Sequence, residues 1–329
     1  MTGRMAPPGW QVWTALGLVY VVWGSTYLGI RYVVESLPAL LAASARFGLA
    51  GLLLAAYLVV RRGRAALLAS GRQYANAVVV GLLLLLGGNG GVVLAEDQGL
   101  PSGLTALLIA VVPLWVVLLR MLDRDRPSSR TVLGVAIGFV GLTVLLGPGA
   151  RPDDVGLGPA ALIVSSSVLW SVGSYLATRL DLPSEPLVAS VAEMLGGAVG
   201  LALFGLLRSE RVHLADVEAS SVIAFAYLVL VGSLVGFTAY SWLLGVAPVS
   251  KVATYAYVNP VVAVVLGALF VGEDITVASV AGGALTLAAV AVVVSQEGLR
   301  RRADPLAVPA DAPAQMPDEL QGRDRSSAT

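Results

Sequence analysis

Two ionisable side chains in this sequence fall well inside apolar segments, where charge is costly. Arg46 lies within 39–60 and Glu193 within 186–207, each roughly 10 Å from the near end of its segment at 1.5 Å per residue. Such residues persist where they face a cavity, a partner or a path for water. One hypothesis is that the pair binds the polar ends of a zwitterionic substrate, or that Glu193 carries a proton. The alternative is structural: Arg46 extends to the membrane surface, or each residue ties down a neighbouring helix.

Aromatic side chains accompany these charges. Trp23 and Tyr27 lie inside 10–30 and Trp170 lies inside 157–178, away from the segment ends where Trp normally collects. We interpret the three as the lining of a central cavity. Ser167, Ser171 and Ser174 share one helical face with Trp170 nearby. For these serines close helix packing is the favoured interpretation, and a cavity role for Ser174 stays open.

Amides and prolines mark two further places. Asn89, within 87–91, needs a polar partner in an apolar helix, either a carbonyl or a substrate. Pro113 and Pro260 interrupt the segments 102–121 and 250–270, and a proline inside a helix removes one hydrogen bond and bends the helix. They are candidate hinges, or else static kinks. Asn259, Tyr255 and Tyr257 lie close to Pro260 and could serve a ligand or the freed carbonyls.

The elements that carry these residues are predicted to be membrane helices. The chain is 57% hydrophobic and 13% charged, whereas soluble domains carry about 25% charged residues. Spanning helices need about 20 apolar residues, and ten segments qualify: 10–30, 39–60, 74–95, 102–121, 130–147, 157–178, 186–207, 220–244, 250–270 and 276–296.

The second half of the chain repeats the first at a spacing of 147 residues. Arg46 corresponds to Glu193, Trp23 to Trp170, and Pro113 to Pro260. Each copy holds five predicted helices, an odd number, so the second copy must enter the membrane from the opposite face. The sequence therefore predicts an inverted repeat, the construction of many transporters.

The distribution of Arg and Lys predicts the orientation. Fourteen of these residues fall in connections on the side of the N-terminus and four on the other side. Because cytoplasmic loops carry the excess of positive charge, both termini are predicted to be cytoplasmic.

Several other classes of protein are disfavoured. The chain has no Cys and one His, so a metal site built from these residues is effectively excluded, and no cofactor is expected. P-loop, nucleophile-elbow and His-Glu-x-x-His signatures are missing from the sequence, so we expect no enzyme and no direct use of ATP. The basic loops are explained by orientation, so no nucleic-acid partner is expected.

Several runs resemble the EamA repeat of the drug/metabolite transporter superfamily, near its YedA-like branch. They are Val22-Trp23-Gly24-Ser25-Thr26-Tyr27-Leu28, Gly88-Asn89-Gly90, Ala95-Glu96, Thr254-Tyr255-Ala256-Tyr257-Val258-Asn259-Pro260 and Gly272-Glu273. The resemblance implies ten helices in two inverted repeats, export by alternating access, and a central cavity. The residues it would place there are Trp23, Tyr27, Arg46, Asn89, Trp170, Glu193 and Tyr257. Relatives often carry a carboxylate where this chain has Asn259.

We therefore expect an all-α integral membrane protein of the bacterial inner membrane, multi-pass, with ten transmembrane helices. The expected parts are a first repeat at 10–148, a second at 157–297 and a disordered cytoplasmic tail at 298–329. The expected function is the secondary transport, most simply the export, of small amphipathic metabolites such as amino acids. An uptake carrier and a non-transporting receptor or scaffold are the alternatives. Proton or ion coupling, substrate identity and oligomeric state stay open.

Overall fold

The computed structural model describes residues 8–121, 127–147, 149–150, 155–177, 179–236, 239–240, 242–243 and 254–303. Every regular element within these ranges is a helix. Eight of the helices are long and apolar enough to cross a membrane, and Ala219–Val235 and Tyr255–Phe270 are shorter apolar helices. The protein is therefore an all-helical membrane protein, as predicted.

The first half of the chain contributes eight longer elements. The first seven, in order, are α1 (Gly9–Val34), α2 (Ala39–Arg62), α3 (Gly71–Gly81) with η2 (Leu82–Asn89) and α4 (Gly90–Asp97), and α5 (Ser102–Ile109) with α6 (Val112–Met121). The helix α7 (Ser129–Leu146) closes this half. Local signals fix several starts: Ser70 and Gln73 form a capping box at α3, and the Ser128 side chain caps α7, each satisfying backbone N–H groups that a helix start leaves free.

The second half follows the same plan. Its elements are α8 (Leu157–Ala177), α9 (Pro186–Leu207), α10 (Ala219–Tyr227) with η4 (Leu228–Val235), α13 (Tyr255–Phe270) and α14 (Val277–Ala303). The last helix thus continues past residue 298, where the sequence predicted a disordered tail to begin. Residues 304–329 of that tail lie outside the described ranges.

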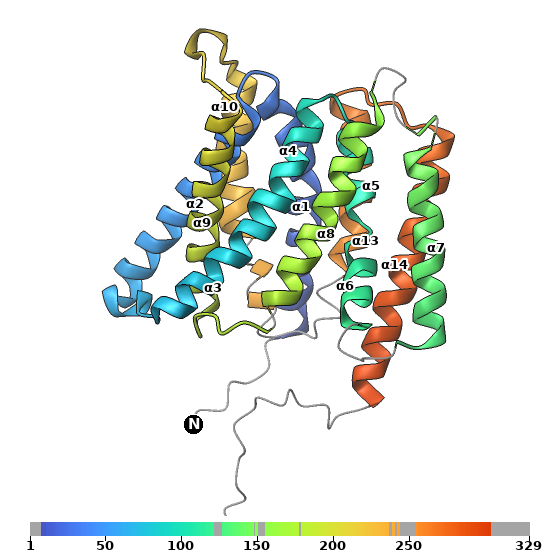
Figure 1. Cartoon of the computed structure of the whole chain (residues 1–329), viewed down its shortest axis with the longest axis horizontal. Helices are drawn as coiled ribbons and strands as arrows, with labels where there is room; N and C mark the ends of the chain where they lie inside the picture. The colour runs from blue at the N-terminus through green and yellow to red at the C-terminus, as the bar shows by residue number, and fades with distance from the viewer. Residues whose placement is uncertain are drawn as a thin grey trace, which may run out of the picture.

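Several of the helix contacts have a counterpart when the two halves are exchanged. The helix α1 packs against α10 and α13, and its counterpart α8 packs against η2, α4, α5 and α6. The helix α2 packs against its own counterpart α9, and α7 against α14. Figure 1 shows α7 and α14 side by side at one end of the molecule, and α2 and α9 at the other. The central helices between these two pairs therefore come from both halves.

A π-helical segment lies at matching places in the two halves. The segment η2 continues α3, and η4 continues α10. A π-helix has wider turns than an α-helix and is rare, usually appearing as a short bulge at a functional site. Neither segment was predicted from the sequence.

The two interior prolines have different local structures. The helix around Pro113 is broken at Ala110 and Val111, between α5 and α6. The helix α13 instead runs through Pro260 without a break. A proline removes one hydrogen bond but does not force an interruption, so the surrounding packing decides whether the helix breaks.

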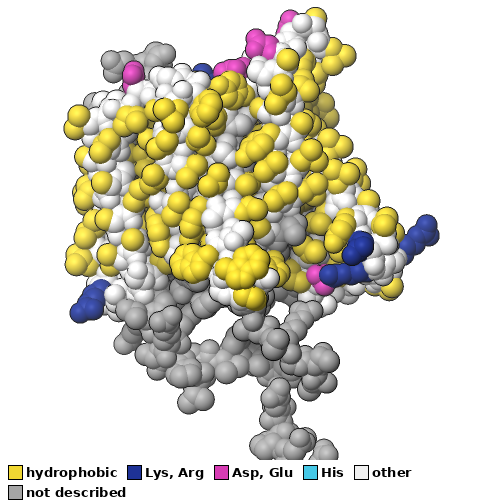
Figure 2. All heavy atoms as spheres, turned by 180° about the vertical axis from the view of Figure 1, so that it is seen from behind, with side chains coloured by type: hydrophobic (Ala, Val, Ile, Leu, Met, Phe, Trp, Pro, Cys, Tyr) yellow, Lys and Arg dark blue, Asp and Glu magenta, His cyan; other side chains and the backbone are white. Residues whose placement is uncertain are grey.

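The outer surface separates charge from apolar area. Figure 2 shows hydrophobic side chains over the middle of the face in view, most of the visible acidic side chains at its upper edge and most of the visible basic side chains at its lower edge. Leu207 and Val60 are more than 80% exposed and Leu269 is 73% exposed. Such an apolar surface is suited to contact with the hydrocarbon core of a membrane.

Candidate substrate cavity

A cavity of about 120 Å³ lies among the central helices of the two halves. Its polar and aromatic lining comes from α1, α2, η2, α8 and α13. These residues are Trp23, Thr26, Tyr27, Arg46, Asn89, Trp170, Tyr255 and Asn259. Apolar residues such as Ile30, Phe47, Leu85 and Val92 complete the wall. The cavity therefore offers aromatic faces together with a few polar groups, which suits a small amphipathic molecule.

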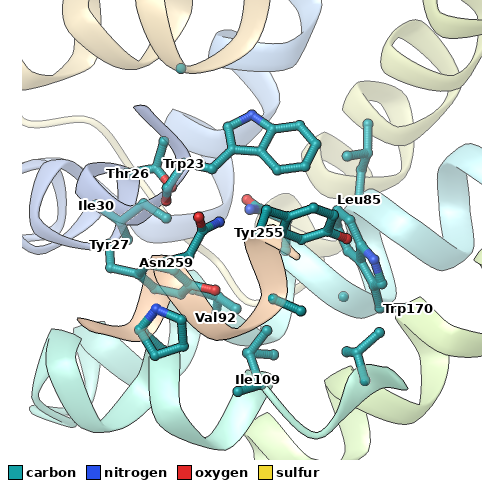
Figure 3. A pocket seen from close by; sticks show the side chains of 18 of the residues that line it. Trp23, Thr26, Tyr27, Ile30, Leu85, Val92, Ile109, Trp170, Tyr255 and Asn259 are labelled. Carbon is teal, nitrogen blue, oxygen red and sulfur yellow. The ribbon is translucent and has the colours of Figure 1, made fainter. Parts of the chain in front are cut away.

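Three aromatic rings pack together at one side of the cavity. The ring centroids of Trp23 and Tyr255 are 5.2 Å apart with the planes nearly perpendicular, and those of Trp23 and Tyr240 are 4.9 Å apart. Edge-to-face contact at these distances is favourable and holds the rings in place. In Figure 3, Tyr255 lies between the indoles of Trp23 and Trp170.

Each of the two indoles rests against a glycine of the other half. A Cβ atom added to Gly236 would lie 2.5 Å from Trp23 Nε1, and one added to Gly88 would lie 2.7 Å from Trp170 Cε3. Both glycines are at or next to a π-helical segment. In both halves, therefore, the indole packs against a glycine of the other half, and the absence of a Cβ atom at that glycine leaves room for the ring.

Arg46 brings a positive charge to the cavity. The residue is 5% exposed, and its Nε donates a hydrogen bond of 3.0 Å to Ser233 Oγ of η4. The guanidinium lies 4.7 Å from the centre of the Phe47 ring. Ser233 uses one of the five N–H groups that an Arg presents, and no ion pair links Arg46 to Glu193 within the described ranges. The guanidinium can therefore receive an anionic group.

Asn89 and Asn259 have different roles. The side-chain oxygen of Asn89 is buried and has no hydrogen-bond partner among the described residues, so it is an acceptor that a ligand could use. The amide of Asn259 lies between the backbone oxygens of Tyr20 and Tyr255, at 3.1 and 3.2 Å. The atom facing two acceptors must be the nitrogen, which therefore ties α13 to α1.

Three predicted lining residues do not reach this cavity. Ser174 donates its hydroxyl to the Trp170 backbone oxygen at 2.8 Å, which is the packing arrangement that the sequence favoured for the serines. Glu193 is not among the residues that line the cavity; its backbone packs against Gly81 of α3, where an added Cβ would lie 2.2 Å from the Glu193 backbone oxygen. Tyr257 packs against the hydrophobic core of the protein.

The cavity includes Thr26 and Phe47, which the sequence did not place there, and Tyr255, which the sequence named only beside Tyr257 as a possible partner near Pro260. Tyr255 lies four residues before Asn259 and shares its helical face, whereas Tyr257 lies two residues away on another face. The helical period could therefore have favoured Tyr255 over Tyr257. Thr26 and Phe47 carry no comparable signal, because each is an ordinary residue next to one that was singled out.

A helical membrane protein whose two halves enclose a cavity of this kind is built as a membrane transporter. The family model described as the EamA-like transporter family matches residues 11–147 and 158–295. The chain belongs to this family, as the sequence motifs indicated.

Individual relatives agree with this assignment. The chain is 38% identical over 262 residues to the uncharacterized inner membrane transporter YedA of Escherichia coli strain K12, covering 80% of this chain and 83% of that protein. It is 24% identical to a probable amino-acid metabolite efflux pump of Salmonella typhimurium, over 87% of this chain and 95% of that protein. A crystal structure of a protein 21% identical in sequence has the same fold, with a TM-score of 0.60 over 86% of this chain and 96% of that one.

Proposed function

We propose that this protein is a secondary transporter of the bacterial inner membrane that exports small amphipathic metabolites, such as amino acids, by alternating access. The observation that carries the proposal is the central cavity, in which Trp23 and Trp170 occupy matching positions of the two halves. Two matching halves can close around one site in two related conformations. Interconversion between these two conformations is the basis of alternating access.

In this proposal the chain crosses the membrane ten times, as two inverted five-helix repeats at 10–148 and 157–297, with both termini cytoplasmic. The helix contacts that have a counterpart in the other half support the repeat. The separation of acidic and basic side chains at opposite edges supports the orientation, since positive charge marks the cytoplasmic side. Pro113 and Pro260 would act as hinges for the helices around the cavity.

The proposed substrate carries an anionic and a cationic end. Its carboxylate would bind the Arg46 guanidinium, a charge-assisted contact. Its ammonium group would bind the free oxygen of Asn89 and the faces of the aromatic rings, which attract cations. The printed name of the Salmonella relative supports amino acids as the substrate class.

The size of the cavity points to a closed state. A volume of about 120 Å³ is below the ~300–1,000 Å³ of typical ligand pockets. We infer that the cavity widens as the halves move, and we propose that Ser174, Glu193 and Tyr257 line it in another state.

A counterflow assay tests the proposal. Purified protein in proteoliposomes would be loaded with a pool of unlabelled amino acids and small metabolites and then offered labelled members of the pool. We expect exchange in the wild type and its loss in Trp23→Ala. The control is Trp10→Ala, because Trp10 is 67% exposed and outside the cavity. Folded protein that exchanges nothing from broad pools would contradict transport and favour the receptor or scaffold.

The direction needs a separate measurement. Inside-out membrane vesicles should accumulate the exchanged substrate if the protein exports it, because their lumen corresponds to the outside of the cell. Accumulation only in right-side-out vesicles would establish the alternative, an uptake carrier.

A further inference from the structure

Glu96 is a buried carboxyl group that the substrate cavity does not use. It lies near the end of α4, is 0% exposed, and neither side-chain oxygen has a hydrogen-bond partner among the described residues. It belongs to the Ala95-Glu96 pair of the sequence motif. Burying a carboxylate without a partner costs far more than burying the neutral acid, so such groups are held neutral or wait for a ligand.

The nearest cation does not neutralise the side chain by a direct bond. Arg31 Nη1 donates to the backbone oxygen of Glu96 at 3.3 Å, not to its carboxyl group. Arg31 still interacts electrostatically with that carboxyl, as does the phenol of Tyr27, also from α1.

A second carboxylate adds negative charge on the other side. Glu273, in the connection between α13 and α14, accepts hydrogen bonds from the backbone N–H groups of Ser102 at 2.6 Å and Gly103 at 2.9 Å. It thereby caps α5, a favourable place for an anion. It also interacts electrostatically with Glu96, and two carboxylates at this place would repel each other.

Residues that interact with Glu96 line two different cavities. Tyr27, on one side, lines the substrate cavity. Arg31 and Glu273, on the other side, line a second cavity of about 560 Å³ between α5, α13 and α14. Glu96 contacts neither cavity directly. The hydroxyls of Ser102 and Thr105, at the start of α5, are also buried without partners, so the polar groups of this region are only partly satisfied in the state described.

From this geometry we propose that the Glu96 carboxyl is the proton-binding site of the transporter, occupied by a proton in the closed state and exposed to water when the contact between α5 and Glu273 opens. The inference rests on the proposed transport function. Loss of the proton would leave an unpaired anion beside Glu273, which the closed packing cannot stabilise. Deprotonation of Glu96 would therefore be linked to the opening of the contact between α5 and Glu273. Movement of protons down their gradient would then drive the transport of the substrate.

Carbodiimide labelling tests the proton site without any substrate. Dicyclohexylcarbodiimide is apolar and reacts with protonated carboxyl groups within membranes. We expect the wild type to form an adduct at Glu96, identified by mass spectrometry of the peptide, that declines as the pH is raised. Glu273, occupied by two N–H groups, should react less. Absence of a Glu96 adduct across the whole pH series would overturn the proposal, as would an adduct whose yield does not change with pH.

Transport measurements on Glu96→Gln then test the coupling. The amide mimics the protonated acid, so exchange in counterflow should continue while accumulation driven by a pH gradient falls about tenfold or more, within the usual range of coupling between sites. Glu218→Gln, in an exposed connection, is the control. Gradient-driven accumulation equal to wild type in Glu96→Gln, or accumulation driven by sodium and indifferent to pH, would overturn the proposal. If the wild type exchanges no substrate, the proposed transport function is contradicted. The carbodiimide labelling then tests by itself whether Glu96 binds a proton.

Discussion

Arg46 sets the charge of the central cavity, and its removal should weaken the binding of an anionic group. Hydrogen bonds to charged groups contribute about 1.5–3 kcal/mol, so we expect Arg46→Ala to reduce substrate exchange roughly 10- to 100-fold. Arg46→Lys keeps the charge but loses the Nε contact to Ser233, and should be intermediate. Counterflow rates at equal amounts of reconstituted protein provide the measurement. Wild-type exchange in Arg46→Ala would assign Arg46 a structural role.

The glycines beneath the two indoles allow a more symmetric test. Gly88→Ala would place a methyl group against Trp170 and Gly236→Ala against Trp23. Because the ring must shift in either variant, we expect both to lower exchange by similar factors while the protein still folds. Gly17→Ala, with nothing within 4 Å of the added Cβ, is the control. An effect of Gly236→Ala without one of Gly88→Ala would mean that only one indole contacts the substrate.

Among the elements, the contact between α3 and α9 depends on a glycine whose replacement has no room. A Cβ at Gly81 would lie 2.2 Å from the Glu193 backbone oxygen, whereas a Cβ at Gly48 would have its nearest neighbour at 3.7 Å. Overpacking against backbone costs about 1–3 kcal/mol, so Gly81→Ala should lower the melting temperature of the solubilised protein. Gly48→Ala should leave it unchanged or raise it, since Ala favours a helix over Gly. Equal melting temperatures of Gly81→Ala and Gly48→Ala would contradict a tight contact between α3 and α9 at Gly81.

At the scale of the whole molecule, the proposed inverted repeat makes a prediction about sidedness. Ser70 follows α2, and His213 follows its counterpart α9; both are exposed. The chain has no native Cys, so Ser70→Cys and His213→Cys can be labelled without background. An impermeant maleimide applied to intact cells should label His213→Cys and should label Ser70→Cys only after the membrane is disrupted. Labelling of both variants from the same side would contradict the inverted arrangement.

Composition and pattern were sufficient to predict the class of this protein. A chain with 57% hydrophobic and only 13% charged residues is expected to fold in lipid, and lipid requires backbone groups to be satisfied within helices. The motifs around Trp23 and Asn259 then led to the family, which the family model confirms. These features are local, because each depends only on residues close together in the chain.

Tertiary packing alone decided which side chains meet. Arg46 and Asn89 line the cavity, while Glu193 does not, although it occupies the repeat position of Arg46. The choice of Tyr255 over Tyr257 depends on the rotation of α13. The sequence fixes neither the rotation of a helix about its axis nor the wider turns of η2 and η4, because both result from contacts with helices distant in the chain. The unpartnered carboxyl of Glu96 emerged for the same reason: only the folded chain shows what a buried group lacks.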